Sequence, residues 1–153
     1  QYLNIKPRWY IEELLQNGKT IPDDVKVHCI KGVPEFIYFA IDRENKNTRV
    51  ITDIDQNIME IKWEKKYRKS KFSKTFSKLP KNLINEIIQI SRKVSKDYLY
   101  IRIDLYVCSN EELKIGELTL HQGSGFDAFK PDDHDIVLGK KILSGYKSGE
   151  FRW

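Results

Sequence analysis

Two acidic residues in the C-terminal half of the sequence are spaced so that they could hold one divalent cation together. Residues 98–108 and 113–121 each alternate apolar and polar side chains, which predicts two strands of an antiparallel hairpin. With Asn110 and Glu111 at the centre of the turn, Asp104 lies directly opposite Glu117. Opposed carboxylates repel each other, and a cation such as Mg²⁺, whose usual ligands are carboxylates, waters and phosphates, removes that repulsion.

The same register places an arginine and a threonine beside the acidic pair. Arg102 lies opposite Thr119 on the polar face, and an arginine suits a phosphate on which charge develops. An alternative remains open, in which Arg102 only neutralises the two acids on a solvated sheet face. We expect the other face to belong to the core, with these opposed pairs: Ile101 with Leu120, Ile103 with Leu118, and Leu105 with Gly116.

The elements that must position these side chains are predicted to form a mostly antiparallel sheet with one main helix packed on it, an α+β fold. A half-buried strand over 24–30 and a strand over 33–42 form a hairpin around a tight turn at Lys31-Gly32. The main helix covers 82–96, with Asn82 as a favourable N-cap. We also expect a strand within 7–15, a turn over 18–23, a short strand over 49–52 and a short helix over 135–143.

Length and composition limit the classes of protein to which the chain could belong. Its 153 residues suit one domain, and 40% hydrophobic with 32% charged residues is not a disordered composition. No apolar run approaches the roughly 18 residues of a membrane helix, and no basic and apolar leader opens the chain, so we expect a cytoplasmic protein. Cys29 and Cys108 lie in apolar runs without metal-ligand spacing, which predicts reduced thiols.

The segment Lys62–Lys81 holds most of the excess positive charge, with nine basic residues and one acid. Its interleaved aromatic side chains leave three interpretations open: a solvated loop whose rings pack on the sheet, a single-stranded nucleic-acid site, or a contact with an anionic substrate or membrane. The solvated loop is favoured, so nucleic acid is not a favoured partner. The sequence carries no signal for an oligomeric state.

Three motifs together resemble the C-terminal half of an ATP-grasp fold. They are Arg102-Ile103-Asp104-Leu105-Tyr106, Gly116-Glu117-Leu118-Thr119 and Gly123-Ser124-Gly125-Phe126. In this order and spacing they are similar to the TupA-like ATP-grasp family of teichuronopeptide biosynthesis, whose members are often labelled as polysaccharide-biosynthesis or glycosyltransferase proteins. The resemblance extends from about Lys6 to Leu143.

The resemblance implies a role for each matching residue. Asp104 and Glu117 match the two acidic metal ligands, and Thr119 stands where many ATP-grasp enzymes have a metal-binding asparagine. Arg102 matches the arginine that stabilises the transferring phosphoryl group. Gly123, Ser124 and Gly125 match a catalytic turn whose N–H groups face an acyl-phosphate intermediate, and Gln122 replaces the proline that some members have there.

The nucleotide side of the site is implied in the same way. Glu12-Glu13-Leu14-Leu15 resembles the hinge that binds adenine, through the Glu12 side chain and the backbone of Glu13 and Leu15. Asp24 falls at the position of the ribose-binding acid, and Lys26 at that of a base that contacts phosphate. Each also has an ordinary structural alternative, as a solvent-facing acid, a residue that begins a strand, or a surface lysine.

The function expected from the resemblance is ATP- and Mg²⁺-dependent ligation of a carboxylate to an amine in the synthesis of a cell-surface polymer. No glycine-rich phosphate loop precedes Glu12, so residues 1–153 are expected to be one partial ATP-grasp domain without the N-terminal nucleotide-binding lobe. Such a fragment should bind ATP weakly and be inactive alone; micromolar affinity for Mg·ATP in calorimetry would contradict this expectation. A glycosyltransferase that uses Asp53-Ile54-Asp55 to hold a metal and a sugar nucleotide is the alternative enzyme.

Overall fold

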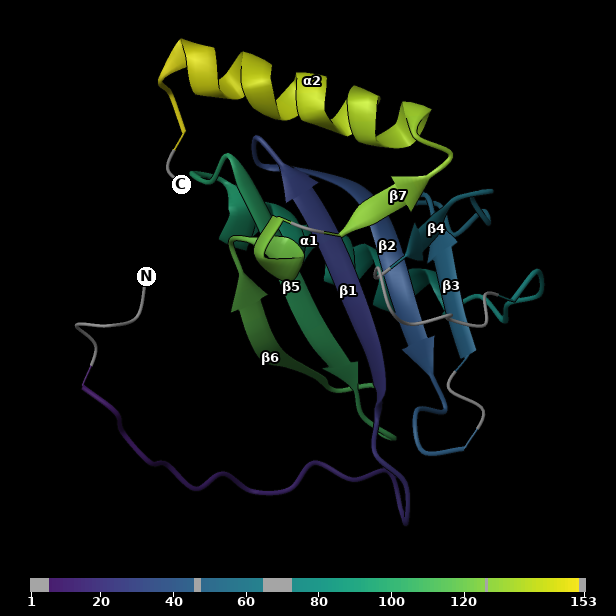
Figure 1. The fold of residues 1–153 in the computed structure, drawn as a ribbon. Helices are drawn as coiled ribbons and strands as arrows, with labels where there is room; N and C mark the ends of the chain where they lie inside the picture. The colour runs from purple at the N-terminus through teal and green to yellow at the C-terminus, as the bar shows by residue number, and fades with distance from the viewer. Residues whose placement is uncertain (1–5, 46–47, 65–72, 126, 152–153) are drawn as a thin grey trace.

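The computed structural model describes residues 6–45, 48–64, 73–125 and 127–151. Within these ranges a five-stranded antiparallel sheet has the strand order β3-β2-β1-β5-β6 (Figure 1). Its strands are β1 (Asp23–Ile30), β2 (Val33–Ile41), β3 (Thr48–Thr52), β5 (Tyr100–Val107) and β6 (Leu113–Thr119). The arrangement confirms the predicted α+β class.

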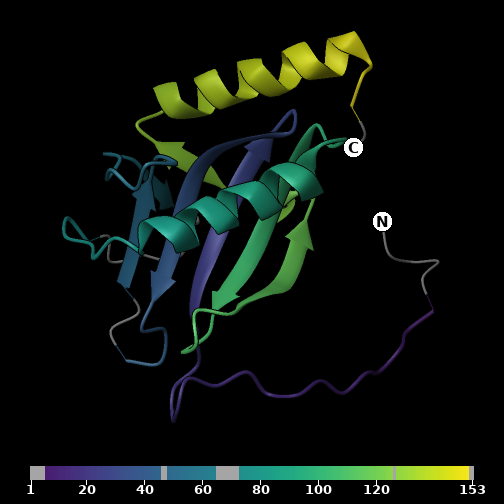
Figure 2. The same ribbon diagram turned by 180° about the vertical axis from the view of Figure 1, so that it is seen from behind.

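Helix α1 (Lys81–Ser95) packs across one face of the sheet and closes the main core (Figure 2). Leu83, Ile84 and Ile87 recur at helical spacing and are buried, as predicted. The predicted N-cap is wrong: Pro80, with an extended ψ of 146°, precedes the first turn, and the Asn82 side chain points to Glu111 instead. The strands contribute Val25, Val27, Cys29, Ile37, Phe39, Val50, Ile101, Ile103 and Leu105 to this core.

A second layer covers part of the opposite face of the sheet. It is a two-stranded ribbon of β4 (Lys62–Glu64) and β7 (Ala128–Lys130), in which Trp63 pairs with Phe129. Its buried aromatic residues pack with Phe36 and Tyr38 of β2 in a cluster completed by Ala40, Ile51 and Ile61. Both faces of β1 are largely buried, so the expectation of a half-buried strand over 24–30 is wrong. The alternation of its residues does not reveal this second layer, because β4 and β7 are far from β1 in the sequence.

The β5–β6 hairpin follows the predicted register only in part. Arg102 pairs with Thr119, Ile103 with Leu118 and Asp104 with Glu117, as expected. A bulge after Asp104 then pairs Leu105 with Ile115 rather than with Gly116. β6 is also an edge strand, so Leu118 and Leu120, expected in the core, remain 50% and 37% exposed.

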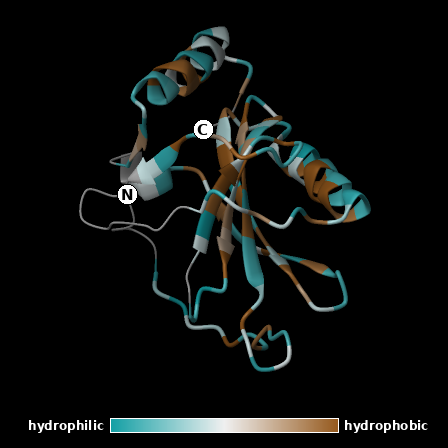
Figure 3. Cartoon of the chain, turned by 90° about the vertical axis from the view of Figure 1, so that its right-hand side faces the viewer, coloured by the Kyte–Doolittle hydropathy of each residue, from teal (hydrophilic) through white to brown (hydrophobic). Residues whose placement is uncertain are grey.

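Helix α2 (Asp133–Ser148) is longer than the short helix expected and lies on the other side of the sheet from α1 (Figure 3). Lys31 of the β1–β2 turn donates to Ser144 (3.4 Å), and Gly145 packs against Leu99. Residues 6–16 contain no strand, contrary to prediction, and extend away from the sheet as an exposed segment (Figure 1). Among the described residues, no helix is long and apolar enough to cross a bilayer.

A buried glutamine ties the segment before α1 to the loop after β3. The Gln56 side chain donates to the backbone oxygen of Leu79 (3.1 Å) and accepts from the Leu79 backbone N–H (2.7 Å). Gln56 is only 5% exposed, so its amide replaces two hydrogen bonds that water would otherwise supply. These two bonds fix where α1 begins relative to the sheet.

We predict that Gln56→Ala lowers the free energy of unfolding by about 1–3 kcal/mol, because it leaves the backbone groups of Leu79 without partners in a partly buried position. Urea denaturation followed by circular dichroism measures the loss. Gln89→Ala, on the exposed side of α1, is the matched control and should change stability by less than about 0.5 kcal/mol. Equal effects of the two substitutions would contradict the role given to Gln56.

Candidate functional site

Strands β1, β5 and β6 bring the predicted polar residues together on the sheet face that points away from α1. The antiparallel pairing sets Lys26 opposite Asp104 and His28 opposite Arg102. On the other side of β5, the pairing with β6 sets Glu117 opposite Asp104 and Thr119 opposite Arg102. Side chains two positions apart along a strand share a face, so these residues form one continuous charged surface.

Asp104 lies at the centre of this surface and is 2% exposed. Arg102 holds it in a bidentate pair: Nε donates to Oδ1 (2.6 Å) and Nη2 donates to Oδ2 (2.8 Å). Lys26 Nζ also donates to Oδ2. A buried carboxylate is tolerated only when it is paired and hydrogen-bonded, and here two cations satisfy it.

Glu117 forms the outer edge of the same group, with 61% of its side chain exposed. Thr119 Oγ1 donates to its Oε1 (2.6 Å), and Arg102 Nη2 donates to its Oε2 (3.4 Å). The four side chains predicted from the hairpin therefore converge on one side of the sheet. Arg102 bonds to both acids, as the ion-pair alternative also predicts, while Glu117 keeps an accessible carboxylate.

Asp24 extends the surface along β1. Lys26 Nζ donates to its Oδ2 (2.6 Å) and Arg43 Nη1 donates to the same atom (3.5 Å), whereas Oδ1 is buried without a partner. Burial raises the pKa of Asp24, against the opposing effect of Lys26. Sequence reasoning missed Arg43, because a single base in a polar turn after β2 carries no signal. Its guanidinium lies 5.6 Å from the centre of the Tyr106 ring.

The predicted adenine hinge lies beside this end of the surface. Glu12, Glu13 and Leu15 line a hollow of about 310 Å³ together with Arg43 and Tyr106. Arg43 thus joins the hollow to Asp24, so the structure brings the expected adenine and ribose residues next to each other. Glu12 and Glu13 are exposed and belong to no strand or helix.

The glycine-rich turn lies at the other end of the hairpin as a short 3₁₀ helix, Gln122–Gly125. The Tyr100 hydroxyl donates to Gln122 Oε1 (2.7 Å), and Tyr100 shares a face of β5 with Arg102, so the turn starts next to the charged surface. Gly123 has a φ of +52°, and a Cβ there would collide with the carboxylate of Asp127. The predicted turn is confirmed; its contact with phosphate stays a prediction.

The other candidate metal motif has a structural role in its own loop. Asp53 Oδ1 accepts from the backbone N–H groups of Asp55 (2.9 Å) and Asn57 (2.8 Å), and Oδ2 accepts from Asn57 Nδ2 (2.9 Å). Burial alone would raise the pKa of Asp53, but these hydrogen bonds lower it. Nothing in this arrangement favours a glycosyltransferase site. Of the basic segment Lys62–Lys81, residues 65–72 lie outside the described residues.

Comparison with known families identifies the family of the chain. A family model described as TupA-like ATPgrasp matches residues 1–143. The chain belongs to the TupA-like ATP-grasp family. The match includes every expected site residue of this TupA-like protein, from Glu12 to Gly125. No curated protein and no solved structure matches the chain.

Asp104 and Glu117, the expected metal ligands of the TupA-like site, differ sharply in burial. We therefore predict that neutralising each acid lowers the free energy of unfolding by a different amount. Asp104→Asn should lower the free energy of unfolding by about 3–5 kcal/mol, because Arg102 and Lys26 lose their buried counter-charge. Glu117→Gln should cost less than about 1 kcal/mol, since its carboxylate is mostly solvated. Urea titrations of both variants test this; a loss for Glu117→Gln as large as that for Asp104→Asn would contradict it.

His28 continues the same face of β1 beyond Lys26 and is 1% exposed. Its ring stacks on Phe36, with centroids 4.1 Å apart, and Nδ1 lies 3.1 Å from the Tyr100 hydroxyl. Burial, together with the positive charges of Arg102 and Lys26, lowers the pKa of His28 well below its usual value. The folded protein therefore holds this histidine in the neutral form.

We predict that this histidine makes stability fall as the pH drops below about 6.5, where the unfolded chain binds a proton that the folded chain does not. The contribution reaches about 1.4 kcal/mol per pH unit and continues down to the lowered pKa of the folded state. Urea unfolding between pH 5 and 8 should give a smaller slope for His28→Gln below about pH 6.5 and equal slopes above about pH 7. Equal slopes throughout would contradict this prediction, because they would show that folding does not change the pKa of His28.

Proposed function

We propose that this ATP-grasp protein binds Mg·ATP on the charged surface and uses it to join a carboxylate to an amine. The observation that carries the proposal is the contact of one arginine, Arg102, with acids on two neighbouring strands, Asp104 and Glu117. A cation bound by both acids and a phosphate bound by the arginine would then lie side by side. That juxtaposition is what phosphoryl transfer needs.

The residues present fit a magnesium ion. Mg²⁺ is usually held by one or two carboxylates, waters and substrate phosphates. Asp104 and Glu117, which lie opposite each other, would be its two carboxylates. No group of three or more His, Cys, Asp or Glu side chains that could hold a metal is found among the described residues. When bound, the ion would neutralise phosphate charge and orient the transferred group.

The basic side chains of the charged surface could exchange their carboxylate partners for the phosphates of a bound triphosphate. Asp24, Asp104 and Glu117 carry three negative charges, which Lys26, Arg43 and Arg102 balance. Arg102 and Lys26 would move from carboxylates to phosphate oxygens, which leaves carboxylate oxygens for the metal. Thr119 donates to Glu117, so we assign it the orientation of that carboxylate rather than ligation.

The nucleotide would lie toward the other end of β1. Oδ1 of Asp24 has no partner and would accept a hydrogen bond from a ribose hydroxyl. The hollow beside Glu12, Glu13 and Leu15 would hold the adenine base. A further lobe that completes the nucleotide site is part of this proposal. We also propose, from the family alone, that the enzyme is cytoplasmic and that its substrates are precursors of a cell-surface polymer.

The reaction would proceed in two balanced steps. A carboxylate oxygen of the substrate forms a bond to the γ-phosphorus of ATP while the bond from that phosphorus to ADP breaks, which gives an acyl phosphate. The amine nitrogen then bonds to the acyl carbon, phosphate leaves, and the nitrogen releases its proton to give an amide. Arg102, Lys26 and the N–H groups of the Gly123–Gly125 turn would stabilise charge on the transferred group.

We predict that Mg·ATP changes the amide NMR signals of β5 and β6 in the full chain, and that Glu117→Gln removes the dependence on Mg²⁺. A ¹H–¹⁵N titration detects millimolar binding, so it works even if the nucleotide site is incomplete. Glu112→Gln is the matched control, because Glu112 is exposed in the same hairpin and pairs with Lys114 at the turn.

The control variant should titrate like the unmodified chain. No signal change on β5 or β6 with millimolar Mg·ATP would overturn the proposed site. The proposed site would also be overturned if titrations with Mg²⁺ and with EDTA were identical, or if Glu117→Gln behaved like Glu112→Gln.

A further inference from the structure

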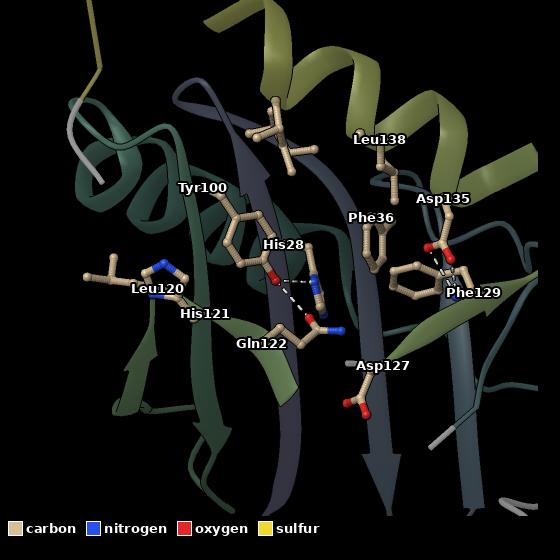
Figure 4. A pocket seen from close by; sticks show the side chains of 13 residues that line it. His28, Phe36, Tyr100, Leu120, His121, Gln122, Asp127, Phe129, Asp135 and Leu138 are labelled. Atoms are coloured by element: carbon tan, nitrogen blue, oxygen red, sulfur yellow. Dashed lines mark hydrogen bonds between the residues drawn. The ribbon is translucent and has the colours of Figure 1, made fainter. Parts of the chain in front are cut away.

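A cavity of about 410 Å³ lies at the end of the charged surface farthest from the adenine hinge. It is bordered by the sheet, the 3₁₀ turn, β7 and α2 and is partly open to solvent (Figure 4). His28 and Tyr100 form its floor, and Gln122 of the turn lies beside them. Because His28 pairs with Arg102, the floor adjoins the proposed reaction centre.

The walls of the cavity are mainly hydrocarbon. They consist of Ile30, Phe36, Leu120, Phe129, Leu138 and Ile142. No lysine or arginine is among the described residues that line it, whereas two carboxylates, Asp127 and Asp135, are. Both oxygens of Asp135 accept from the Phe129 backbone N–H (3.1 and 3.0 Å), so Asp127 is the carboxylate that remains for a ligand.

Two residues that line the cavity each have one buried acceptor atom without a partner. Asp127 Oδ2 is one of them. The other is His28 Nε2: the Tyr100 hydroxyl donates to Gln122, so His28 Nδ1–H donates to that hydroxyl, and Nε2 carries the lone pair. The indole N–H of Trp63 also lacks a partner, but Trp63 does not line the cavity. Both atoms are covered by protein, so a ligand would contact them only if these side chains moved. A donor would then be favoured, because an unmade hydrogen bond in a buried position is costly.

We propose that this cavity binds the amine substrate, a protonated amine attached to a hydrocarbon or aromatic body. An ammonium group has three donors and no acceptor, and its charge complements Asp127. A carboxylate of the same shape would meet two acceptors, one of them charged, and no cation. The role of the bound amine as nucleophile rests on the proposed function, but its binding does not.

The position of the cavity agrees with this assignment. Arg102 separates it from Asp104 and Glu117 by one step along β5, and Gln122 belongs to both the cavity wall and the glycine-rich turn. The carboxylate substrate would be activated beside Arg102, and the amine would approach from the cavity after it releases one proton to solvent, which frees the nitrogen lone pair for attack. The two substrates would thus be separated by charge, with the anion on the cationic part of the surface and the cation in the apolar cavity.

The test is an NMR titration of the full chain, without nucleotide, with 2-phenylethylamine, 3-phenylpropanoate and 2-phenylethanol. We expect the amine to shift signals of β7 and α2 and to bind at least about tenfold more tightly than the other two compounds, as a charge-assisted hydrogen bond provides. Asp127→Asn should reduce amine affinity by about tenfold and leave the binding of the alcohol unchanged.

Gly139 offers a variant that blocks the cavity without disturbing the fold. It lines the cavity from α2, and a Cβ there meets no atom within 4 Å. Gly139→Phe should abolish the shifts, and Gly139→Ala should preserve them, since both replacements favour the helix over glycine. Equal binding of the acid or the alcohol, or shifts that persist in Gly139→Phe, would overturn the assignment. Because no nucleotide is present, that failure is distinct from a failure of the Mg·ATP titration.

Discussion

The structure depends on the ion pairs that surround Asp104 in the middle of the sheet. A carboxylate that is 2% exposed requires full pairing, which Arg102 of the same strand and Lys26 of the neighbouring strand β1 supply. The contact with Lys26 depends on β1 lying next to β5, in the register that sets Lys26 opposite Asp104. The same groups that satisfy the sheet internally are those that a metal and a phosphate would recruit, so stability and the proposed chemistry draw on one set of side chains.

The polar face of β1 changes character along its length. Asp24 lies beside Arg43 and the hollow of the hinge, Lys26 lies among the carboxylates, and His28 forms the floor of an apolar cavity. A nucleotide, a transferred phosphoryl group and an amine would therefore meet different surroundings at successive positions of one strand. In the proposed reaction, the sites for the nucleotide, the transferred phosphoryl group and the amine would follow one another along β1, from the hinge toward α2.

Local sequence patterns predicted much of this arrangement, and their failures share one origin. Alternation in 98–108 and 113–121 predicted the pairs Arg102–Thr119 and Asp104–Glu117, and helical spacing predicted α1. The bulge that shifts Leu105 from Gly116 to Ile115 left no mark in the alternation, because the extra residue lies beside the exposed edge of the sheet. Family motifs supplied the site residues, whereas Arg43 belongs to no pattern and became visible only through its contact with Asp24.

The sequence by itself determined which residues could carry charge chemistry and which strand face they share, since both follow from residue type and a period of two. Only the tertiary structure decided how deeply that face is buried. The β4–β7 ribbon joins Trp63 to Phe129, and α2 then closes the cavity above His28. These contacts link segments remote in the chain, and burial depends on what packs against a surface. A periodic pattern identifies a face but does not specify what covers it.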